Sequence, residues 1–491
     1  MNGSKFVADN SSSVKATNCL SVEPGLCDGS SYADHYDDAS ASLVVLCAIL
    51  LIFMRSGFLY VELAFSMTHK RKRVVLAKYC DLFAGTLGFW LFGFAISGST
   101  DTKILGAEQD FLFWFLRFMF ATNAATILGG TLVGQEVEMR TVATFIYGFV
   151  MTGLIHPGVA NFFWSLQSWL SDTAVFSPYH SCNGTNTARR DHQFLFASGG
   201  ESFYFFDLAG AGVVHVCGGA GAFVLSVFHK LELSKRGRRL QNVPLLRRRD
   251  TLGELKGDAQ MKMRSRKLRP SRTSWRPDNI LRNFVDWMYY RGTEEQENIE
   301  SAALGVLILW TSWFCYTAGA TEAISGKMAH AAVGRICTTI CLAAASGGVT
   351  QAILSGLVQM ASRHAHYNTN ELANAVVASL VAVTGCCAFI SPPWAIPIGC
   401  ATVFIYHTGC FIEYCLGLHD GARVFPVHAV CGLWGLLCVG VFRNTCLVRE
   451  LYENLCYCLN SDLPSSVMIR AECHTIQMGG DVHSPLVTGP G

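Results

Sequence analysis

Ionisable side chains are scarce in this chain. Only 15% of its 491 residues are Asp, Glu, Lys or Arg, whereas soluble globular proteins carry about 25%. Apolar residues make up 51% of the chain, and the mean hydropathy is +0.31. This composition excludes a disordered protein and argues against a large soluble enzyme. The net charge of only +2 also excludes a nucleic-acid binder held by overall charge, so we predict no nucleic-acid partner.

Motifs for catalysis and for metal binding are also lacking. The sequence contains no nucleophile–base motif, no phosphate-binding loop and no metal-ligand spacing among its 20 cysteines. The nearest candidate, His364 with His366, falls in a short predicted loop, and we interpret it as a surface pair. The sequence therefore predicts neither an enzyme nor a resident cofactor.

Long apolar runs are what the chain has in abundance. A helix needs about 20 apolar residues to cross the hydrocarbon core of a bilayer. Ten runs meet that length, and their Gly and Ala content is typical of membrane helices that pack closely. The runs cover residues 43–66, 74–97, 111–133, 141–164, 204–229, 301–324, 332–360, 371–391, 393–415 and 423–443. We therefore predict an all-α polytopic membrane protein.

The uneven distribution of charge predicts the orientation. Residues 230–282 hold 17 Lys and Arg against 5 Asp and Glu. Basic residues in short loops mark the cytosolic side, and this segment falls on the same side as the basic loop 70–73 when the N-terminus is outside. Glycosylation sequons at Asn2, Asn10 and Asn183 fall on the opposite side. The sequence predicts a multi-pass plasma-membrane glycoprotein with an external N-terminus.

An Asp and a His recur at the same spacing in the two halves of the chain. A shift of 213 residues superposes Asp207 on Asp420 and His215 on His428. Because each half holds five spans, an odd number, the second half enters from the opposite face. Inverted repeats of this kind place the working site near the middle of the membrane, around a central pore. The predicted parts are an extracellular segment (1–42), the first repeat (43–229), a basic cytosolic loop (230–300), the second repeat (301–443) and a tail (444–491).

The two histidines and the preceding Asp207 are the candidate pore residues. An imidazole deep in an apolar helix is costly unless it faces a partner or a pore. One interpretation is a pair of structural core histidines; the other is a pair that meets at the centre and serves a small polar molecule or a proton. Asp207 is interpreted either as the cap of its helix or as a source of negative potential below an external cation entrance, and the two roles are compatible.

Four ordered motifs resemble the ammonium transporter family (Amt/Mep/Rh), and its Amt branch in particular. The motifs are Ala121-Thr-Asn-Ala-Ala-Thr126, Asp207-Leu-Ala-Gly-Ala-Gly-Val-Val-His215, Trp313-Phe-Cys-Tyr-Thr-Ala-Gly319 and Val427-His-Ala-Val-Cys-Gly432. The resemblance runs from about Leu43 to Arg443. It implies a homotrimer in which each subunit holds its own pore.

The resemblance also implies roles for seven residues. His215 and His428 correspond to the twin pore histidines, and Asp207 to the acidic residue beneath the external ammonium site. Phe120 and Tyr316 correspond to the two rings of the external gate. Trp164 and Ala320 correspond to the tryptophan and the frequent serine of the cation site.

The mechanism implied is recruitment of ammonium outside, loss of its proton near the gate, passage of ammonia along the histidines, and reprotonation inside. Aromatic rings attract a cation by about 0.5–2 kcal/mol each, whereas a bare cation in an apolar pore is costly. Two alternatives stay open. One is an ammonium sensor or non-conducting regulator of the same fold, and the other is an Rh-like channel for neutral gas.

The sequence departs from the family pattern at several places. The family has an eleventh long helix, but residues 444–491 contain no apolar run of that length, so we expect this helix to be missing. Three arginines lie inside predicted spans, namely Arg55, Arg117 and Arg335. We interpret each as a member of a structural ion pair with an acidic residue such as Glu62 or Asp81. The basic loop is interpreted as a solvated segment or as a contact with anionic membrane lipids.

Overall fold

The structure of the chain is a computed structural model. It describes residues 38–66, 71–97, 111–132, 141–164, 206–241, 298–321, 329–361, 369–418, 420–444 and 447. Several parts of the chain discussed above lie outside these residues. They are the three sequons, the motif His364-Ala-His366, most of the basic loop and nearly all of the C-terminal tail. The expectation of a missing eleventh helix falls on that tail and is therefore also outside them. All regular secondary structure in the described residues is helical, as predicted.

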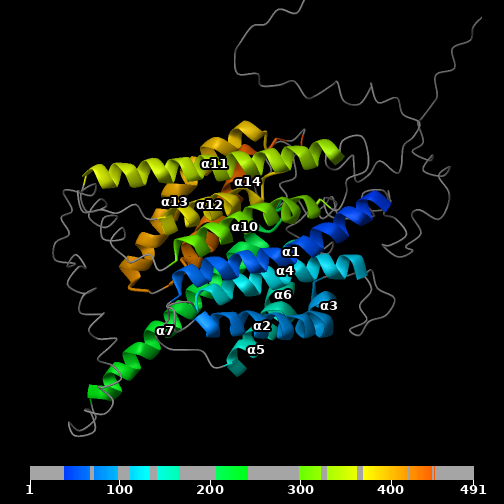
Figure 1. The fold of residues 1–491 in the computed structure, drawn as a ribbon. Helices are drawn as coiled ribbons and strands as arrows, with labels where there is room; N and C mark the ends of the chain where they lie inside the picture. The colour runs from blue at the N-terminus through cyan, green and yellow to red at the C-terminus, as the bar shows by residue number, and fades with distance from the viewer. Residues whose placement is uncertain are drawn as a thin grey trace, which may run out of the picture.

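The first repeat contributes five helical segments, three of which contain a π-helical stretch. They are α1 (Asp38–Phe65), α2 (Arg71–Gly88) continued through Phe89–Gly93 into α3 (Phe94–Ile96), α4 (Phe111–Gly130), α5 (Thr141–Val150) continued through Met151–Ile155 into α6 (His156–Trp164), and α7 (Cys217–Gln241), which follows a π-helical stretch at Ala211–Val216. Helix α7 extends past the predicted end of its span at residue 229 and projects from the bundle (Figure 1).

The second repeat contributes five more segments. They are α10 (Ile299–Gly319), α11 (Ala329–Ala361), α12 (Thr369–Thr384), α13 (Ala395–Leu416), preceded by a 3₁₀ turn at Pro392–Trp394, and α14 (Cys431–Phe442), preceded by a π-helical stretch at Phe425–Val430. The ten segments form one bundle, with α11 along one edge and α2 and α5 along the other (Figure 1). Each predicted span corresponds to one of them.

Helices α1 and α10 pack against each other in opposite directions. A Cβ atom built on Gly57 would lie 2.8 Å from Leu309, one on Gly305 would lie 2.7 Å from Val61, and one on Gly319 would lie 2.8 Å from Cys47. The residue number rises along one helix as it falls along the other, so the helices are antiparallel. Because they open the first and the second repeat, the two repeats are inverted. The small residues permit the close approach that holds membrane helices together.

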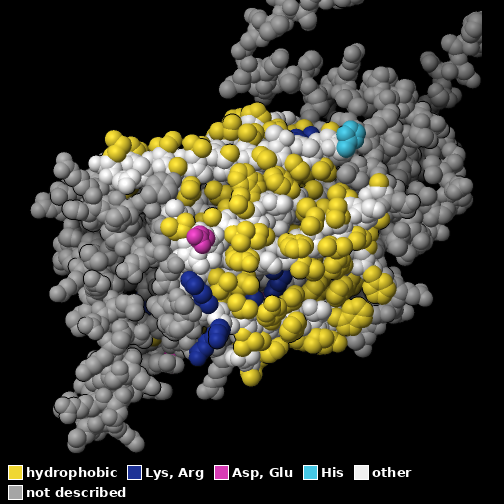
Figure 2. Space-filling view, viewed as in Figure 1, with side chains coloured by type: hydrophobic (Ala, Val, Ile, Leu, Met, Phe, Trp, Pro, Cys, Tyr) yellow, Lys and Arg dark blue, Asp and Glu magenta, His cyan; other side chains and the backbone are white. Residues whose placement is uncertain are grey.

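The outer face of the bundle is apolar. Large hydrophobic side chains such as Phe53, Phe83 and Leu437 are more than half exposed, and charged side chains are few on the face shown in Figure 2. Eight described helices are long and apolar enough to cross a membrane. The two remaining predicted spans, α4 and α12, are inner helices; α12 has 16 residues, and nearly all of them are buried against other helices. An apolar surface of this extent suits lipid rather than water.

Charged side chains inside the first repeat pair with one another, as the sequence predicted for Arg55. The Arg55 guanidinium forms an ion pair with Asp81. The Lys78 ammonium lies 2.6 Å from Glu62 and donates to the Thr126 carbonyl at 2.7 Å. All four ionic groups are buried. Partners of this kind offset the cost of burying charge between α1, α2 and α4.

Replacing Asp81 with leucine is expected to destabilise the protein by about 3–5 kcal/mol, because the guanidinium of Arg55 then stays buried without its counter-charge. The double replacement of Arg55 and Asp81 with leucine removes both charges and should restore part of that loss. Thermal unfolding of the purified protein in detergent measures both effects. A single variant as stable as the unaltered protein would contradict the structural role of the pair.

Candidate functional site

Two π-helical stretches, one from each repeat, carry the predicted pore histidines. His215 lies in Ala211–Val216 and His428 in Phe425–Val430. An aspartate precedes each stretch. Both carboxylate oxygens of Asp207 accept backbone N–H groups, from Ala211 at 2.6 Å, Gly212 at 2.8 Å and Val213 at 3.0 Å.

The second aspartate repeats this arrangement. Asp420 accepts the N–H of Phe425 at 2.8 Å. Both aspartates therefore bond to the first N–H groups of their helices, groups that have no partner within the helix. This is the capping role that the sequence predicted for Asp207. The two halves of the chain therefore share the aspartate that caps the start of each histidine segment, as well as the spacing between that aspartate and the histidine.

Two glycines allow the histidine segments to cross closely. A Cβ atom on Gly219 would collide with the backbone N of Ala429, the residue after His428. A Cβ atom on Gly432 would lie 2.7 Å from the Ala211 carbonyl oxygen, at the start of the segment that holds His215. These are the glycines that the shift of 213 residues superposes. Because neither glycine has a side chain, the two segments can cross closely enough for the histidines to meet.

The two imidazoles meet at the centre of the bundle. The Nδ1 atoms of His215 and His428 lie 3.2 Å apart, and the rings are stacked with centroids 5.3 Å apart. Only 1% of His215 and 4% of His428 is exposed. One Nδ1 must carry a proton and donate to the other, so the pair shares a single hydrogen bond and holds complementary tautomers. The predicted convergence of the two histidines is present.

Aromatic side chains enclose the pair. His215 stacks on Trp313 with centroids 5.2 Å apart and ring planes within 7°. Phe58 approaches His428 with centroids 5.6 Å apart. Among the described residues, the Nε2 atom of His215 has no hydrogen-bond partner although it is buried. A small polar molecule could form a hydrogen bond with that nitrogen in otherwise apolar surroundings.

The predicted gate and cation-site rings are also neighbours. Phe120 packs edge-on against Tyr316 with centroids 5.0 Å apart and against Trp164 at 5.7 Å. Trp164 donates its Nε1–H to the main-chain carbonyl of Asp207 at 2.9 Å. Tyr316 in turn packs edge-on against His215 at 5.9 Å. A continuous series of rings therefore connects Trp164 with the histidine pair.

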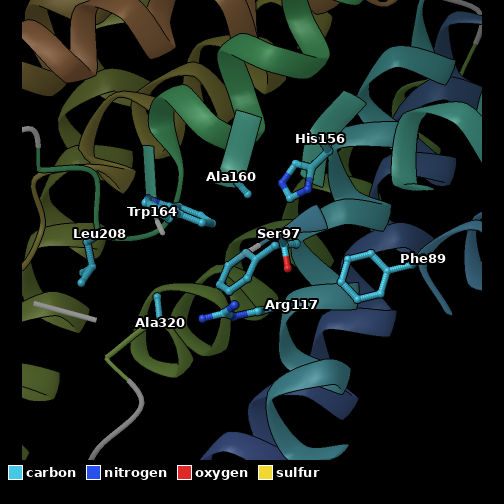
Figure 3. Close-up of a pocket in the computed structure, with 9 residues that line it drawn as sticks. Phe89, Ser97, Arg117, His156, Ala160, Trp164, Leu208 and Ala320 are labelled. Atoms are coloured by element: carbon cyan, nitrogen blue, oxygen red, sulfur yellow. The ribbon is translucent and has the colours of Figure 1, made fainter. Parts of the chain in front are cut away.

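A pocket lies beside Phe120 and Trp164, and Figure 3 shows the side chains that line it. Three residues that the sequence assigned to the entrance line it, namely Phe120, Trp164 and Ala320. The other lining residues are Phe89, Ser97, Arg117, His156, Ala160 and Leu208. Asp207 and Tyr316 are not among them.

Sequence reasoning missed His156 as a pocket residue and read Arg117 only as a structural charge. Each is a polar side chain in an apolar span, the same signal that singled out the pore histidines. Among the described residues, neither ring nitrogen of His156 has a hydrogen-bond partner, and 3% of the residue is exposed. Only the fold shows that both side chains reach the pocket.

The inverted repeats and the buried histidine pair define a polytopic membrane protein with the architecture of a transporter. Comparison with known proteins identifies the family to which the chain belongs. The model of the Ammonium Transporter Family matches residues 42–244 and 290–478, and the chain belongs to this family.

Curated relatives agree with that assignment. Ammonium transporter Amt2 of Archaeoglobus fulgidus is 27% identical over 412 residues, which cover 82% of this chain and 70% of the relative. Ammonium transporter 1 member 3 of Solanum lycopersicum is 23% identical over 445 residues, which cover 87% and 80% of the two chains. The chain is thus similar to both over most of its length.

Solved structures support the fold. A structure titled "Sensor Amt Protein" superposes with a TM-score of 0.56 at 20% identity, covering 86% of this chain and 88% of that one. Mep2 of Candida albicans superposes with a TM-score of 0.57 at 16% identity, covering 85% and 76%. The polytopic helical architecture is therefore shared with Amt and Mep2 proteins.

Proposed function

We propose that this chain carries ammonium or ammonia across a membrane, along a path past His215 and His428. The observation that carries the proposal is the 3.2 Å contact between their Nδ1 atoms, at the crossing of two inverted repeats. A path between such repeats is typical of transporters. Membership of the ammonium transporter family supports the choice of ammonium or ammonia over other small molecules.

The apolar surroundings of the path favour passage of a neutral molecule. Burying a bare ammonium ion among Phe58, Trp313 and Tyr316 would cost many kcal/mol, whereas ammonia is neutral. In the proposed sequence, ammonium arrives at the pocket that Phe120 and Trp164 line, which we call the outer pocket. It loses a proton before Phe120 and Tyr316, and ammonia then passes the histidines and is reprotonated inside. The Nε2 of His215, which has no hydrogen-bond partner within the described part of the chain, supplies one for ammonia along the way.

We also propose an orientation and an assembly for the chain. The first turn of α2 and the last turns of α7 are basic, and Lys230 of α7 donates to the Leu416 carbonyl at the end of α13. These ends are proposed to face the cytosol, with the N-terminus outside and the chain in the plasma membrane as a glycoprotein. The resemblance to the family supports a homotrimer with one pore per subunit. The basic loop is proposed to contact anionic lipids of the inner leaflet.

A second candidate function is ammonium sensing without conduction. The packing of the gate favours it, because Phe120 and Tyr316 are in edge contact and only 5% and 0% exposed. In this state the rings block the way from the outer pocket to His215. A sensor keeps such a block permanently, whereas a transporter must open it during each cycle.

Growth of cells that lack ammonium uptake distinguishes the two functions. A transporter is expected to restore growth when ammonium is the sole nitrogen source at low concentration. The protein must be shown at the cell surface by labelling. Failure to restore growth despite normal surface abundance would contradict transport and favour the sensor.

A further inference from the structure

His156 is a buried histidine whose ring lines the outer pocket (Figure 3). Only 3% of the residue is exposed. Within the part of the chain that the structure describes, neither Nδ1 nor Nε2 of the ring has a hydrogen-bond partner. Buried polar groups of native proteins nearly always have such a partner, and a group left without one costs free energy. The ring is therefore expected to take its partner from the contents of the pocket.

The start of helix α6 holds this ring in a fixed place. His156 follows directly on the π-helical stretch Met151–Ile155, and stretches of this kind occur often at functional sites. Thr152 in the stretch donates its hydroxyl to the Gly85 carbonyl of α2 at 2.9 Å. A Cβ atom on Gly153 would lie 2.9 Å from another carbonyl oxygen of α2. Close packing against α2 thus fixes the backbone that carries the imidazole.

Two of the described side chains in the wall of the pocket can accept a hydrogen bond. The polar side chains of the wall are Ser97, Arg117, His156 and Trp164. A guanidinium and an indole donate only, whereas a neutral imidazole accepts on one nitrogen and donates from the other. The Ser97 hydroxyl donates to a main-chain carbonyl of α3 at 2.7 Å, which leaves its oxygen able to accept. The acceptors among these side chains are therefore Ser97 and a neutral His156.

Acceptors of this kind distinguish ammonium from an alkali cation of similar size. The rings of Phe120 and Trp164 attract any small cation, so they do not favour ammonium over potassium. Ammonium carries N–H groups that donate hydrogen bonds, whereas potassium carries none and is bound in proteins by oxygen atoms. A site built around a buried acceptor rejects a ligand that cannot donate to it, because the acceptor is then left unpaired.

We propose that His156 makes the outer pocket selective for ammonium over potassium, by accepting an N–H of the bound ammonium on one ring nitrogen. The inference rests on the proposed function and deepens it, because it names the residue that recognises the substrate at the entrance. Ser97 is a second acceptor for the same ligand. No covalent bond changes in this step, and the proton of ammonium is lost later, before Phe120 and Tyr316.

Binding of radiolabelled methylammonium to the purified full-length protein in detergent tests the role of the ring. Methylammonium retains N–H groups, and unlabelled ammonium and potassium compete with it for the pocket. His156→Phe keeps an aromatic ring but loses both nitrogens. We expect it to bind ammonium roughly tenfold more weakly, while its affinity for potassium stays unchanged. His156→Gln keeps an acceptor and should stay within about threefold of the unaltered protein for both ions.

His407→Gln is the matched control for these variants. His407 is also a buried histidine, but it bonds to Gln351 between α13 and α11 and is not among the described residues that line the pocket. Its affinity for ammonium should stay within about twofold of the unaltered protein. An equal loss of affinity for ammonium and potassium in His156→Phe would indicate a change in the shape of the pocket, and would overturn the inference. So would a folded His156→Phe protein that keeps its selectivity.

The unaltered protein provides a second measurement that needs no variant to fold. Ammonium should displace bound methylammonium at a concentration at least roughly tenfold lower than potassium does, because potassium leaves the acceptor of His156 unpaired. Equal displacement by the two ions would overturn the inference, and so would the absence of methylammonium binding.

These measurements separate the inference from the proposed function. If the protein transports no ammonium, but its selectivity in binding is lost in His156→Phe, the ring acts as proposed and only conduction fails. If transport is present and His156→Phe binds both ions as the unaltered protein does, transport stands and the proposed recognition fails.

Discussion

Replacing His215 with alanine is expected to lower ammonium uptake at least tenfold. The change removes the hydrogen bond to His428 and the ring that stacks on Trp313. Ammonia then lacks a polar partner among the apolar rings around this position. The remaining histidine is left buried with one unsatisfied nitrogen. Initial uptake rates of labelled ammonium in cells, corrected for surface abundance, measure the effect.

His407→Gln is a suitable control for this loss. His407 is also a buried histidine in a membrane helix, but it lies on α13 and bonds to Gln351 of α11 at 2.8 Å. The glutamine retains a polar side chain at that position. Uptake by the control should remain within about twofold of the unaltered protein. Equal losses in both variants would indicate that any buried histidine is needed for folding, and would contradict a special role for His215.

Adding a methyl group at Gly219 or at Gly432 is expected to disrupt the centre of the bundle. The new Cβ would collide with the backbone of the opposite histidine segment, at Ala429 or at Ala211. Overpacking of a tight core costs about 1–3 kcal/mol or more. The two segments must then separate, which lengthens the distance between the imidazoles. We expect lower thermal stability together with loss of uptake.

Gly440→Ala is the matched control for this prediction. Gly440 lies on α14, like Gly432, but a Cβ atom built on it meets nothing within 4 Å. Alanine there should leave stability and uptake unchanged, or raise stability slightly because alanine favours helices. Thermal unfolding in detergent and uptake in cells measure the three variants. If Gly219→Ala or Gly432→Ala behaves like Gly440→Ala, the close crossing is not required.

The sequence was sufficient to predict the ten helical segments and their inverted arrangement. Length and hydropathy identify a membrane helix locally, because the bilayer sets the requirement for each span separately. The match of Asp207 and His215 with Asp420 and His428 revealed the symmetry. The π-helical stretches and the long extension of α7 were not predicted, because they depend on packing between helices and on local hydrogen bonding.

The candidate site was predicted in part. The pairing of His215 with His428 and the proximity of Phe120 to Trp164 agree with the expected geometry. The place of Arg117 in the pocket was not foreseen, because the sequence of α4 does not show which of its side chains line a cavity. Which polar side chains line a cavity is decided by tertiary packing.

The central claim is that the histidine pair lies on a path for ammonia. The most direct test is the flux into vesicles that contain the purified full-length protein and an internal pH indicator. When ammonium is added outside, entering ammonia takes up protons and raises the internal pH. The account predicts a rise several-fold faster than in protein-free vesicles, and a return to the protein-free rate with His215→Ala. A folded, vesicle-inserted protein that leaves the rate unchanged would contradict it.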